Sequence, residues 1–173
     1  MFADRVDHVM ARYKRRNDNL FAVLFIDLDR FKVVNDSLGH LVGDDLLVET
    51  ANRLCQCVRP SDTVTRMGGD EFTILMEDLK SIDEALHIAE RIQEKLAEPF
   101  TVQGQAIITT ASIGIALSSA HYNNADQILR DADIAMYRAK CNGKSRYEIF
   151  DSEMHTRALK LLKLENDLRS AIQ

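Results

Sequence analysis

Two aspartates follow a short apolar stretch near the start of the chain. Residues 20–26 are apolar without interruption and rich in β-formers, and the run stops at Asp27, with Asp29 two positions later. This pattern predicts a buried strand that delivers carboxylates at its end, and residues two apart on an extended chain point to the same side. The pair predicts either a cation site at one end of a sheet or acids that simply end a strand at the surface.

A glycine pair precedes a second group of acids. Residues 68–72 read Gly-Gly-Asp-Glu-Phe and lie between two β-rich runs, which is typical of a hairpin because glycines accept the positive φ angles of tight turns. Asp70 and Glu71 repel each other unless they are exposed or neutralised by a cation. If this hairpin neighbours the strand of Asp27, three carboxylates converge, and such oxygen ligands suit Mg²⁺ bound with substrate phosphates. The alternative is a solvated acidic hairpin.

Composition limits the classes of protein that can carry these residues. The chain has 173 residues, 46% of them hydrophobic and 28% charged, with two Pro, seven Gly and a net charge of −5. These values fit one globular domain and exclude disordered or low-complexity architecture. The acidic balance argues against a nucleic-acid-binding surface. The longest apolar run, Leu20–Ile26, is far below the roughly 20 residues of a membrane-spanning helix.

The cysteines point to a reducing compartment. Cys55, Cys57 and Cys141 are odd in number, and Cys55 and Cys57 lack the two-residue spacer of a zinc or redox pair. We therefore expect reduced thiols and a cytoplasmic location.

Hydrophobic periodicity predicts the elements that must position the acids. Their order is αβααββαββαβα. Hairpins outnumber strand–helix–strand crossovers, which predicts an α+β fold with one sheet covered by helices. The expected elements are a helix over about 2–16, a strand over 20–26, two helices of which the one with the apolar stripe 47–58 ends before Pro60, a hairpin of 63–67 and 72–77, a helix over 82–96 opened by a Ser81–Glu84 capping box, a hairpin of 100–102 and 106–117 around Gly104, a helix from the cap Asn124 to Ala139, a strand over 147–150, and a last helix from Asp151.

Four motifs, taken in order, resemble the GGDEF family, the diguanylate cyclases. The motifs are GGDEF at 68–72, Asp27-Leu28-Asp29-Arg30-Phe31-Lys32 with Asn35-Asp36, which is similar to the family's DxDxFKxxND segment, Gly39-His40 with Gly43-Asp44, and Ala139-Lys140 with Gly143-Lys144, which is similar to AKxxG[RK]. The resemblance implies a nucleotide-cyclase-like, polymerase-palm-like (ferredoxin-like) domain over 1–150. It also implies condensation of two GTP into cyclic di-GMP and two pyrophosphates.

The resemblance assigns a role to each matching residue. Two Mg²⁺ or Mn²⁺ ions per active site are expected, and their implied ligands are Asp27, the main-chain carbonyl of Leu28, Asp70 and Glu71. Asp70 is also the implied assistant in deprotonating the attacking hydroxyl, and Lys32 is implied to stabilise charge on the phosphates. The implied substrate-binding residues are Asn35, His40, Asp44, Gly68, Gly69, Lys140 and Lys144.

Side-chain chemistry agrees with several of these roles. An amide at Asn35 and a carboxylate at Asp44 can read the edge of guanine. Lys140 and Lys144 are four positions apart, which predicts that they share one helix face, where they resemble the family's triphosphate-binding pair. The structural alternative for these lysines is the common cationic end of a helix.

A second site is predicted upstream of the glycine pair. Arg59 and Asp62 form an RxxD that five residues separate from GGDEF, and this spacing resembles the family's inhibitory site for cyclic di-GMP. Pro60 ends the preceding helix, so both side chains are expected to project outward from a turn. Arg91 on the next helix is a candidate additional contact.

The resemblance also implies partners. One domain offers one GTP site while the product contains two guanylates, so two domains must face each other in a transient two-fold homodimer. An LTGLxNR-like family segment would lie before residue 1, and residues 151–173 resemble the connector to an EAL phosphodiesterase domain, so we expect a fragment of a larger signalling protein. Two other hypotheses stay open: a non-catalytic domain that binds GTP or cyclic di-GMP and controls a neighbouring EAL domain, and a mononucleotide cyclase or polymerase-like enzyme, for which the RxxD offers no support.

Overall fold

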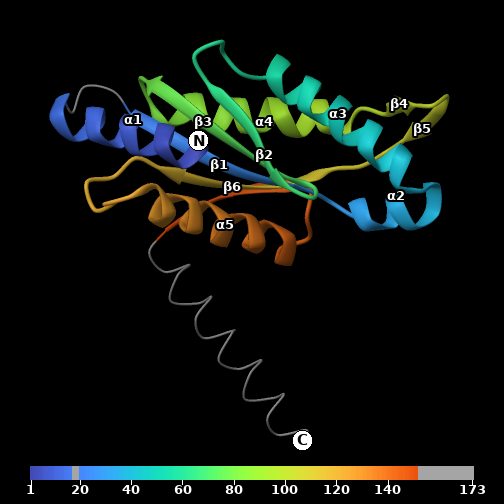
Figure 1. The fold of residues 1–173 in the computed structure, drawn as a ribbon. Coiled ribbons are helices and arrows are strands. Elements are labelled where there is room, and N and C mark those ends of the chain that lie inside the picture. The colour runs from blue at the N-terminus through green and yellow to red at the C-terminus, as the bar shows by residue number, and fades with distance from the viewer. Residues whose placement is uncertain (17–19, 152–173) are drawn as a thin grey trace, which may run out of the picture.

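The computed structural model describes residues 1–16 and 20–151, and a central mixed sheet organises them (Figure 1). The sheet has the strand order β2-β3-β1-β6-β7, and β4 and β5 form a separate two-stranded ribbon. The bounds of the elements are α1 Phe2–Arg16, β1 Leu20–Leu28, α2 Phe31–Leu38, α3 His40–Gln56, β2 Thr63–Gly68, β3 Glu71–Leu79, α4 Ile82–Ala97, β4 Phe100–Val102, β5 Gln105–Ile107, β6 Ala111–Leu117, α5 Ala125–Cys141 and β7 Arg146–Ile149.

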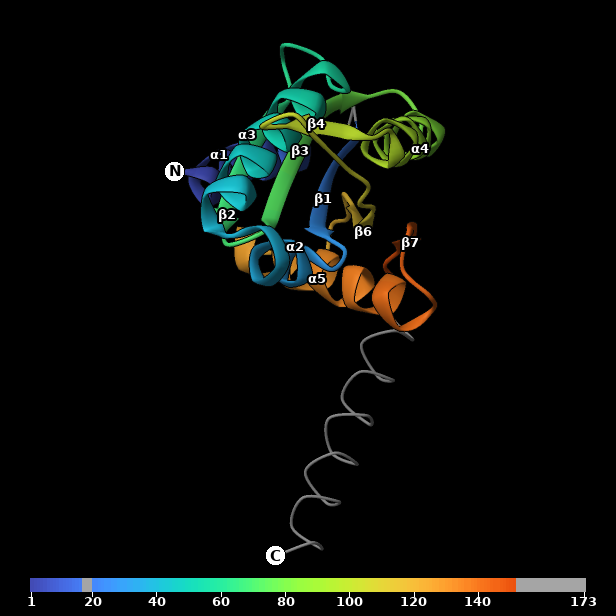
Figure 2. The ribbon, with the colours of Figure 1, turned by 90° about the vertical axis from the view of Figure 1, so that its right-hand side faces the viewer.

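Helices cover both faces of the sheet, as Figure 2 shows from the side. The central strand β1 pairs antiparallel with β3 and with β6, while β6 and β7 are parallel. Alternate side chains of β1 enter two separate cores: Leu24 and Ile26 pack on the face of α3 and α4, and Phe21 and Val23 pack on the face of α1 and α5. The predicted α+β fold with one helix-covered sheet is confirmed.

The predicted strand over 106–117 is wrong, because the run belongs to two strands in two sheets. β5 ends at Ile107 and β6 begins at Ala111. Between them the Thr109 hydroxyl donates to the Asp29 carbonyl oxygen at 2.8 Å, and the Thr110 hydroxyl donates to the Asp29 carboxylate at 2.6 Å. These contacts draw the chain out of one ribbon and into the central sheet.

Two smaller predictions need correction at the ends of elements. The strand predicted to end before Asp27 continues through Leu28, so Asp27 lies within it. Ser81 does precede α4, but its side chain makes no capping hydrogen bond, and Glu84 pairs with Arg59 instead of closing a capping box. By contrast, Asn124 caps α5 by accepting from the backbone N–H of Gln127.

Three other sequence-based expectations concern the cysteines, membrane-spanning helices and the C-terminal helix. The three cysteines are free thiols, as expected. Within the described part of the chain, none of the helices combines the length and the apolar character that crossing a membrane would require. The helix expected from Asp151 onward, and with it most of the connector, lies outside the described residues.

Candidate functional site

The sheet brings the two groups of acids to one end. β3 is a direct neighbour of β1, and Asp27 lies opposite Glu71 in the antiparallel register. Residues opposite each other on antiparallel strands project on the same face, with neighbouring Cβ atoms. The Gly-Gly turn folds back on the end of β1, since the Leu28 N–H donates to the Asp70 carbonyl oxygen at 3.4 Å. The sequence predicted that these acids converge if the Gly-Gly hairpin neighbours the strand of Asp27. This condition is met.

Helix α5 adds a cation to this end of the sheet. The Lys140 Nζ lies 2.6 Å from Asp27 Oδ2, and the two side chains are 29% and 10% exposed. The helix approaches closely because β6 carries Gly114 beneath it, where an added Cβ would lie 1.9 Å from the Ala132 carbonyl oxygen. Lys140, predicted to bind triphosphate, is thus paired with a predicted metal ligand.

Negative charge exceeds positive charge around this pair. Burial raises the pKa of Asp27; Lys140 lowers it, and the nearby Asp70 and Asp29 raise it further. The pKa of Glu71 is also raised, first by burial and then by the charges of Asp133, Asp27 and Asp70. Carboxylates whose pKa is raised by burial and by neighbouring acids form a site that favours an added cation.

Sequence reasoning missed Asp133. Its pKa is raised by partial burial and lowered by Lys140, so its carboxylate belongs to the same electrostatic cluster. It lies seven positions before Lys140, which places both residues on one face of α5. That spacing was the available signal, and it becomes informative only once Lys140 is known to face the acids.

The donor chemistry of this cluster fits a hard divalent cation. Carboxylates and a main-chain carbonyl are the ligands that Mg²⁺ and Mn²⁺ take. Across residues 1–16 and 20–151, however, no three acidic, histidine or cysteine side chains already surround a common point as metal ligands. Asp27 instead faces Lys140. Metal binding would therefore require side chains to rearrange.

Asp29 has a different role from Asp27, although both are acids at the end of β1. It is 5% exposed, and its carboxylate accepts from the Thr110 hydroxyl at 2.6 Å, the Ser112 hydroxyl at 2.7 Å and the Ser145 N–H at 3.0 Å. These bonds tie the end of β1 to the start of β6 and to the loop after α5. Asp29 is a structural anchor for that loop.

A second polar feature lies between α2 and α3. The Asn35 Oδ1 is buried, and among the described residues it has no hydrogen-bond partner. It lies over Gly43, where an added Cβ would be only 1.9 Å away. A buried acceptor without a donor costs about 1–3 kcal/mol, so this arrangement favours a ligand that brings an N–H group. The neighbouring Asp44 is exposed on α3.

The other predicted substrate residues lie at the ends of elements, and one prediction about them needs correction. Lys32 is exposed in the first turn of α2, and His40 is the exposed first residue of α3. The predicted shared helix face of the two lysines is wrong: α5 ends at Cys141, and Lys144 lies beyond it with a φ of 63°. The chain reverses at Gly143, which has a φ of 113°, so Lys144 lies outside the helix.

The RxxD turn lies at the opposite end of β2. Arg59 is exposed, as predicted, and its guanidinium pairs with Glu84 at 3.1 Å. Asp62 is half-buried rather than directed outward: its carboxylate accepts from the backbone N–H of Arg59 at 2.9 Å and of Glu77 at 3.2 Å. The Asp62 carboxylate points inward because these backbone N–H donors lie within hydrogen-bond distance of it. Arg91 donates to the Cys57 carbonyl oxygen next to this turn.

Glu77 links that turn to α1, which sequence reasoning did not foresee. Its carboxylate accepts from Arg5 Nε at 3.0 Å and from an Arg12 nitrogen at 3.1 Å, and its side chain is only 10% exposed. Arg5 also donates to the Ser61 carbonyl oxygen at 3.3 Å. The charges around the RxxD turn thus alternate in sign and pair with one another.

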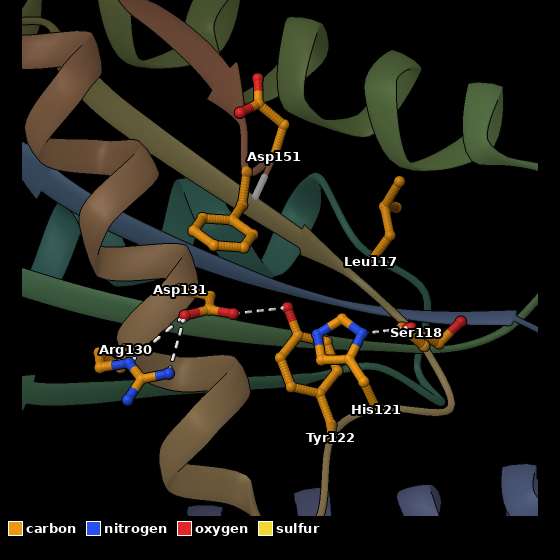
Figure 3. Close-up of a pocket in the computed structure, with 9 residues that line it drawn as sticks. Leu117, Ser118, His121, Tyr122, Arg130, Asp131 and Asp151 are labelled. Carbon is orange, nitrogen blue, oxygen red and sulfur yellow. Dashed lines mark hydrogen bonds and ion pairs between the residues drawn. The ribbon is translucent and has the colours of Figure 1, made fainter. Parts of the chain in front are cut away.

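A cavity of about 560 Å³ lies at the C-terminal end of β6, next to Leu117, whereas Asp27 and Glu71 lie at the opposite end of the sheet (Figure 3). Its polar groups satisfy each other: the Tyr122 hydroxyl donates to Asp131 at 3.0 Å, and Ser119 bonds to His121 at 2.6 Å. Burial and the charge of Asp131 raise the pKa of Tyr122, which keeps the phenol neutral. This cavity offers a less convincing ligand site than the charged end of the sheet.

Comparisons with known proteins identify the family of the chain. A family model described as "Diguanylate cyclase, GGDEF domain" matches residues 1–146. The chain is 42% identical over 158 residues to the bifunctional diguanylate cyclase/cyclic di-GMP phosphodiesterase MucR of Pseudomonas aeruginosa, covering 91% of the chain. It is 37% identical over 171 residues to the cyclic di-GMP phosphodiesterase PdeR of Escherichia coli, covering 98% of the chain.

Solved structures give the same fold. The GGDEF domain of TpbB (YfiN) from Pseudomonas aeruginosa superposes with a TM-score of 0.87 at 38% identity, covering 92% of each chain. The expected palm-like cyclase fold is confirmed by this match. The present chain spans only 23% of MucR and 25% of PdeR, so most of each of these relatives has no counterpart in it.

Proposed function

The chain belongs to the GGDEF family of diguanylate cyclases, and from this premise we propose that it condenses two GTP molecules into cyclic di-GMP and two pyrophosphates. The observation that carries the proposal is the end of the sheet where Asp27 faces Glu71, beside a cation on α5. Among the described residues the Asn35 oxygen has no hydrogen-bond partner, which supports the choice of a guanine nucleotide because guanine presents N–H donors along one edge.

Each residue of the site has a task in this reaction. Asp27, the Leu28 carbonyl, Asp70 and Glu71 would hold two Mg²⁺ or Mn²⁺ ions, which when bound neutralise charge during in-line phosphoryl transfer. Asp70 helps to remove the proton of the attacking 3′-hydroxyl. The nucleotide is oriented by the guanine-reading Asn35 and Asp44, by the phosphate-binding Lys32, Lys140 and Lys144, and by His40, Gly68 and Gly69.

The product requires two domains. Each chain carries one such site, and cyclic di-GMP joins two guanylates through two bonds, so two copies face each other about a two-fold axis. Turnover should therefore rise more steeply than linearly with protein concentration. A strictly linear dependence, at concentrations where light scattering reports monomers, would contradict the two-fold arrangement.

Product feedback at the RxxD turn is part of the proposal. Arg59 can address guanine O6 and N7 with its guanidinium, but it must first exchange its ion pair with Glu84. Asp62 offers the ligand only the lone pairs that its two backbone bonds leave unused. Arg59 is therefore the stronger of the two predicted contacts.

A regulatory role is the second candidate. PdeR is named a phosphodiesterase, yet it contains a segment similar to 98% of this chain. A domain of this kind would bind GTP or cyclic di-GMP without turnover and control an EAL phosphodiesterase joined to it. Such a domain needs the nucleotide contacts but does not need Asp70 as a proton acceptor.

Mass analysis of the products formed from GTP and Mg²⁺ separates the two candidates. The proposed cyclase yields cyclic di-GMP, and Asp70→Ala abolishes turnover while leaving the thermal midpoint nearly unchanged, because a turn acid contributes little packing. Nucleotide binding without product would favour the regulatory role. Unchanged turnover by Asp70→Ala would refute the catalytic assignment.

A further inference from the structure

We propose that Lys140 is an exchangeable counter-ion: it holds Asp27 while no nucleotide is bound, and it transfers to the triphosphate when a divalent cation takes its place on Asp27. This inference rests on the proposed function and assigns Lys140 a second role there, as the residue that couples cation binding to nucleotide binding.

The first observation is the ion pair itself. The Lys140 Nζ contacts Asp27 Oδ2 at 2.6 Å, and the side chain of Asp27 is 10% exposed. A carboxylate with so little access to water is costly without a partner, so the pair stabilises the site as it stands. A divalent cation that binds Asp27 must compete with the ammonium group for the same carboxylate.

The second observation is that the described charges that act on Asp27, apart from Lys140, are those of acids. Asp70 and Glu71 add negative charge near Asp27, and Asp133 adds more from α5. Asp29 is engaged by three donors and cannot accept the displaced ammonium group readily. A divalent cation that binds Asp27, Asp70 and Glu71 uses these carboxylates and repels the ammonium group, so of the described acids that interact with Lys140 only Asp133 remains available and a further anion is favoured.

The third observation is that Lys140 can move without moving its helix. It lies in the last turn of α5, its side chain is 29% exposed, and a lysine carries its charge on a flexible four-carbon stem. The triphosphate of a bound nucleotide would supply the anion. Cation and nucleotide then strengthen each other's binding, because each relieves the cost that the other creates.

Mn²⁺ titration followed by electron paramagnetic resonance tests this exchange directly. The proteins are the wild type and Lys140→Met, which keeps the apolar stem and removes the charge. Without nucleotide, we expect Lys140→Met to bind Mn²⁺ at least about tenfold more tightly, because no ammonium competes. With a non-hydrolysable GTP analogue, we expect the variant to bind the analogue more weakly and to lose most of the mutual strengthening.

Two further variants serve as controls. Lys140→Arg restores the charge and should return nucleotide-free Mn²⁺ affinity toward the wild-type value. Lys80→Met removes a charge from an exposed position after β3 and should leave it unchanged, which excludes an effect of net charge alone. Circular dichroism confirms that each variant is folded.

The outcomes separate this inference from the proposed function. If the wild type binds Mn²⁺ with the analogue but Lys140→Met binds Mn²⁺ alone no more tightly than the wild type does, the exchange is refuted and the cyclase proposal stands. If the wild type binds no Mn²⁺ even with the analogue, both are refuted.

Discussion

At the Gly-Gly turn the β2–β3 hairpin places Glu71 opposite Asp27, whereas at its other end it places Glu77 between two arginines of α1. Both ends are rich in charged residues. At the first end burial and neighbouring acids raise the pKa of Asp27 and of Glu71, and Lys140 is the cation that acts on both. At the second end acids and bases alternate, and even the carboxylate of Asp62 is used by the backbone.

This difference indicates what each end is for. A surplus of one charge is unfavourable for the folded domain alone and becomes favourable when a ligand of opposite charge binds. A balanced set of ion pairs stabilises the fold without a ligand, and a ligand can bind there only by exchanging pairs. Residue types alone do not distinguish the two ends; the partners of each side chain do.

The largest expected contrast comes from the same substitution at the two ends. Glu71→Gln should lower turnover by roughly 100-fold or more, because even indirect changes to a metal site cost 10–100-fold. Glu77→Gln should leave turnover per folded molecule nearly unchanged, while it lowers stability by about 1–2 kcal/mol through weakened charged hydrogen bonds. Steady-state kinetics and thermal unfolding check both variants. Turnover lost equally in both would contradict the assignment of separate roles.

Arg59→Ala probes the balanced end. Loss of a charged hydrogen bond should weaken cyclic di-GMP binding by roughly 10–100-fold, while GTP affinity stays near the wild-type value. Glu84→Gln frees Arg59 from its ion pair and should strengthen product binding a few-fold. Calorimetry with each nucleotide measures both effects. Equal cyclic di-GMP binding by the wild type and Arg59→Ala would show that the RxxD turn is not a binding site for the product.

Gly43→Ala tests the polar opening beside the charged end. The new methyl group would collide with the Asn35 amide, so GTP affinity should fall roughly tenfold and the preference for GTP over ATP should weaken. Asn35→Ala should have a similar effect. The double variant should lose no more than either single variant, because both act on one contact. Additive losses would show that Gly43 acts elsewhere.

The smallest effect is a pH dependence of stability. The pKa values of Asp27 and Glu71 are raised above 3.8 and 4.5, so the native state binds these protons more tightly than the unfolded chain does. Their destabilising contribution is absent below these ordinary values and grows as the pH rises through the raised native values. Urea unfolding should therefore show Glu71→Gln gaining stability relative to the wild type between about pH 4.5 and 7. A constant difference would contradict the charge surplus.

The sequence was sufficient for those parts of the fold and site that local patterns control. The apolar run of β1 and the Gly-Gly turn predict strands, and only their pairing was needed to bring Asp27 opposite Glu71. The strand over 106–117 was wrong because residues 108–110 carry no turn signal, and a distant residue, Asp29, redirects them.

The parts that could not be predicted depend on competition between partners. Asp27 and Asp29 look alike in the sequence, but one meets Lys140 and the other meets three donors far along the chain, at the start of β6 and in the loop after α5. Lys144 lies outside α5 because the chain reverses after Cys141. Asp62 turns inward because its carboxylate accepts hydrogen bonds from backbone N–H groups of the turn. Such choices are made by tertiary contacts, which spacing does not encode.

Thermal unfolding with a non-hydrolysable GTP analogue and Mg²⁺ tests the central contrast most directly. At a ligand concentration of about 100 times Kd, binding stabilises the native state by about 2.7 kcal/mol, which corresponds to a rise in Tm of roughly 5–10 °C for a chain of this size. The charge surplus predicts this rise for the wild type and for Glu77→Gln, and its loss in Glu71→Gln. An undiminished rise in Glu71→Gln would contradict the account.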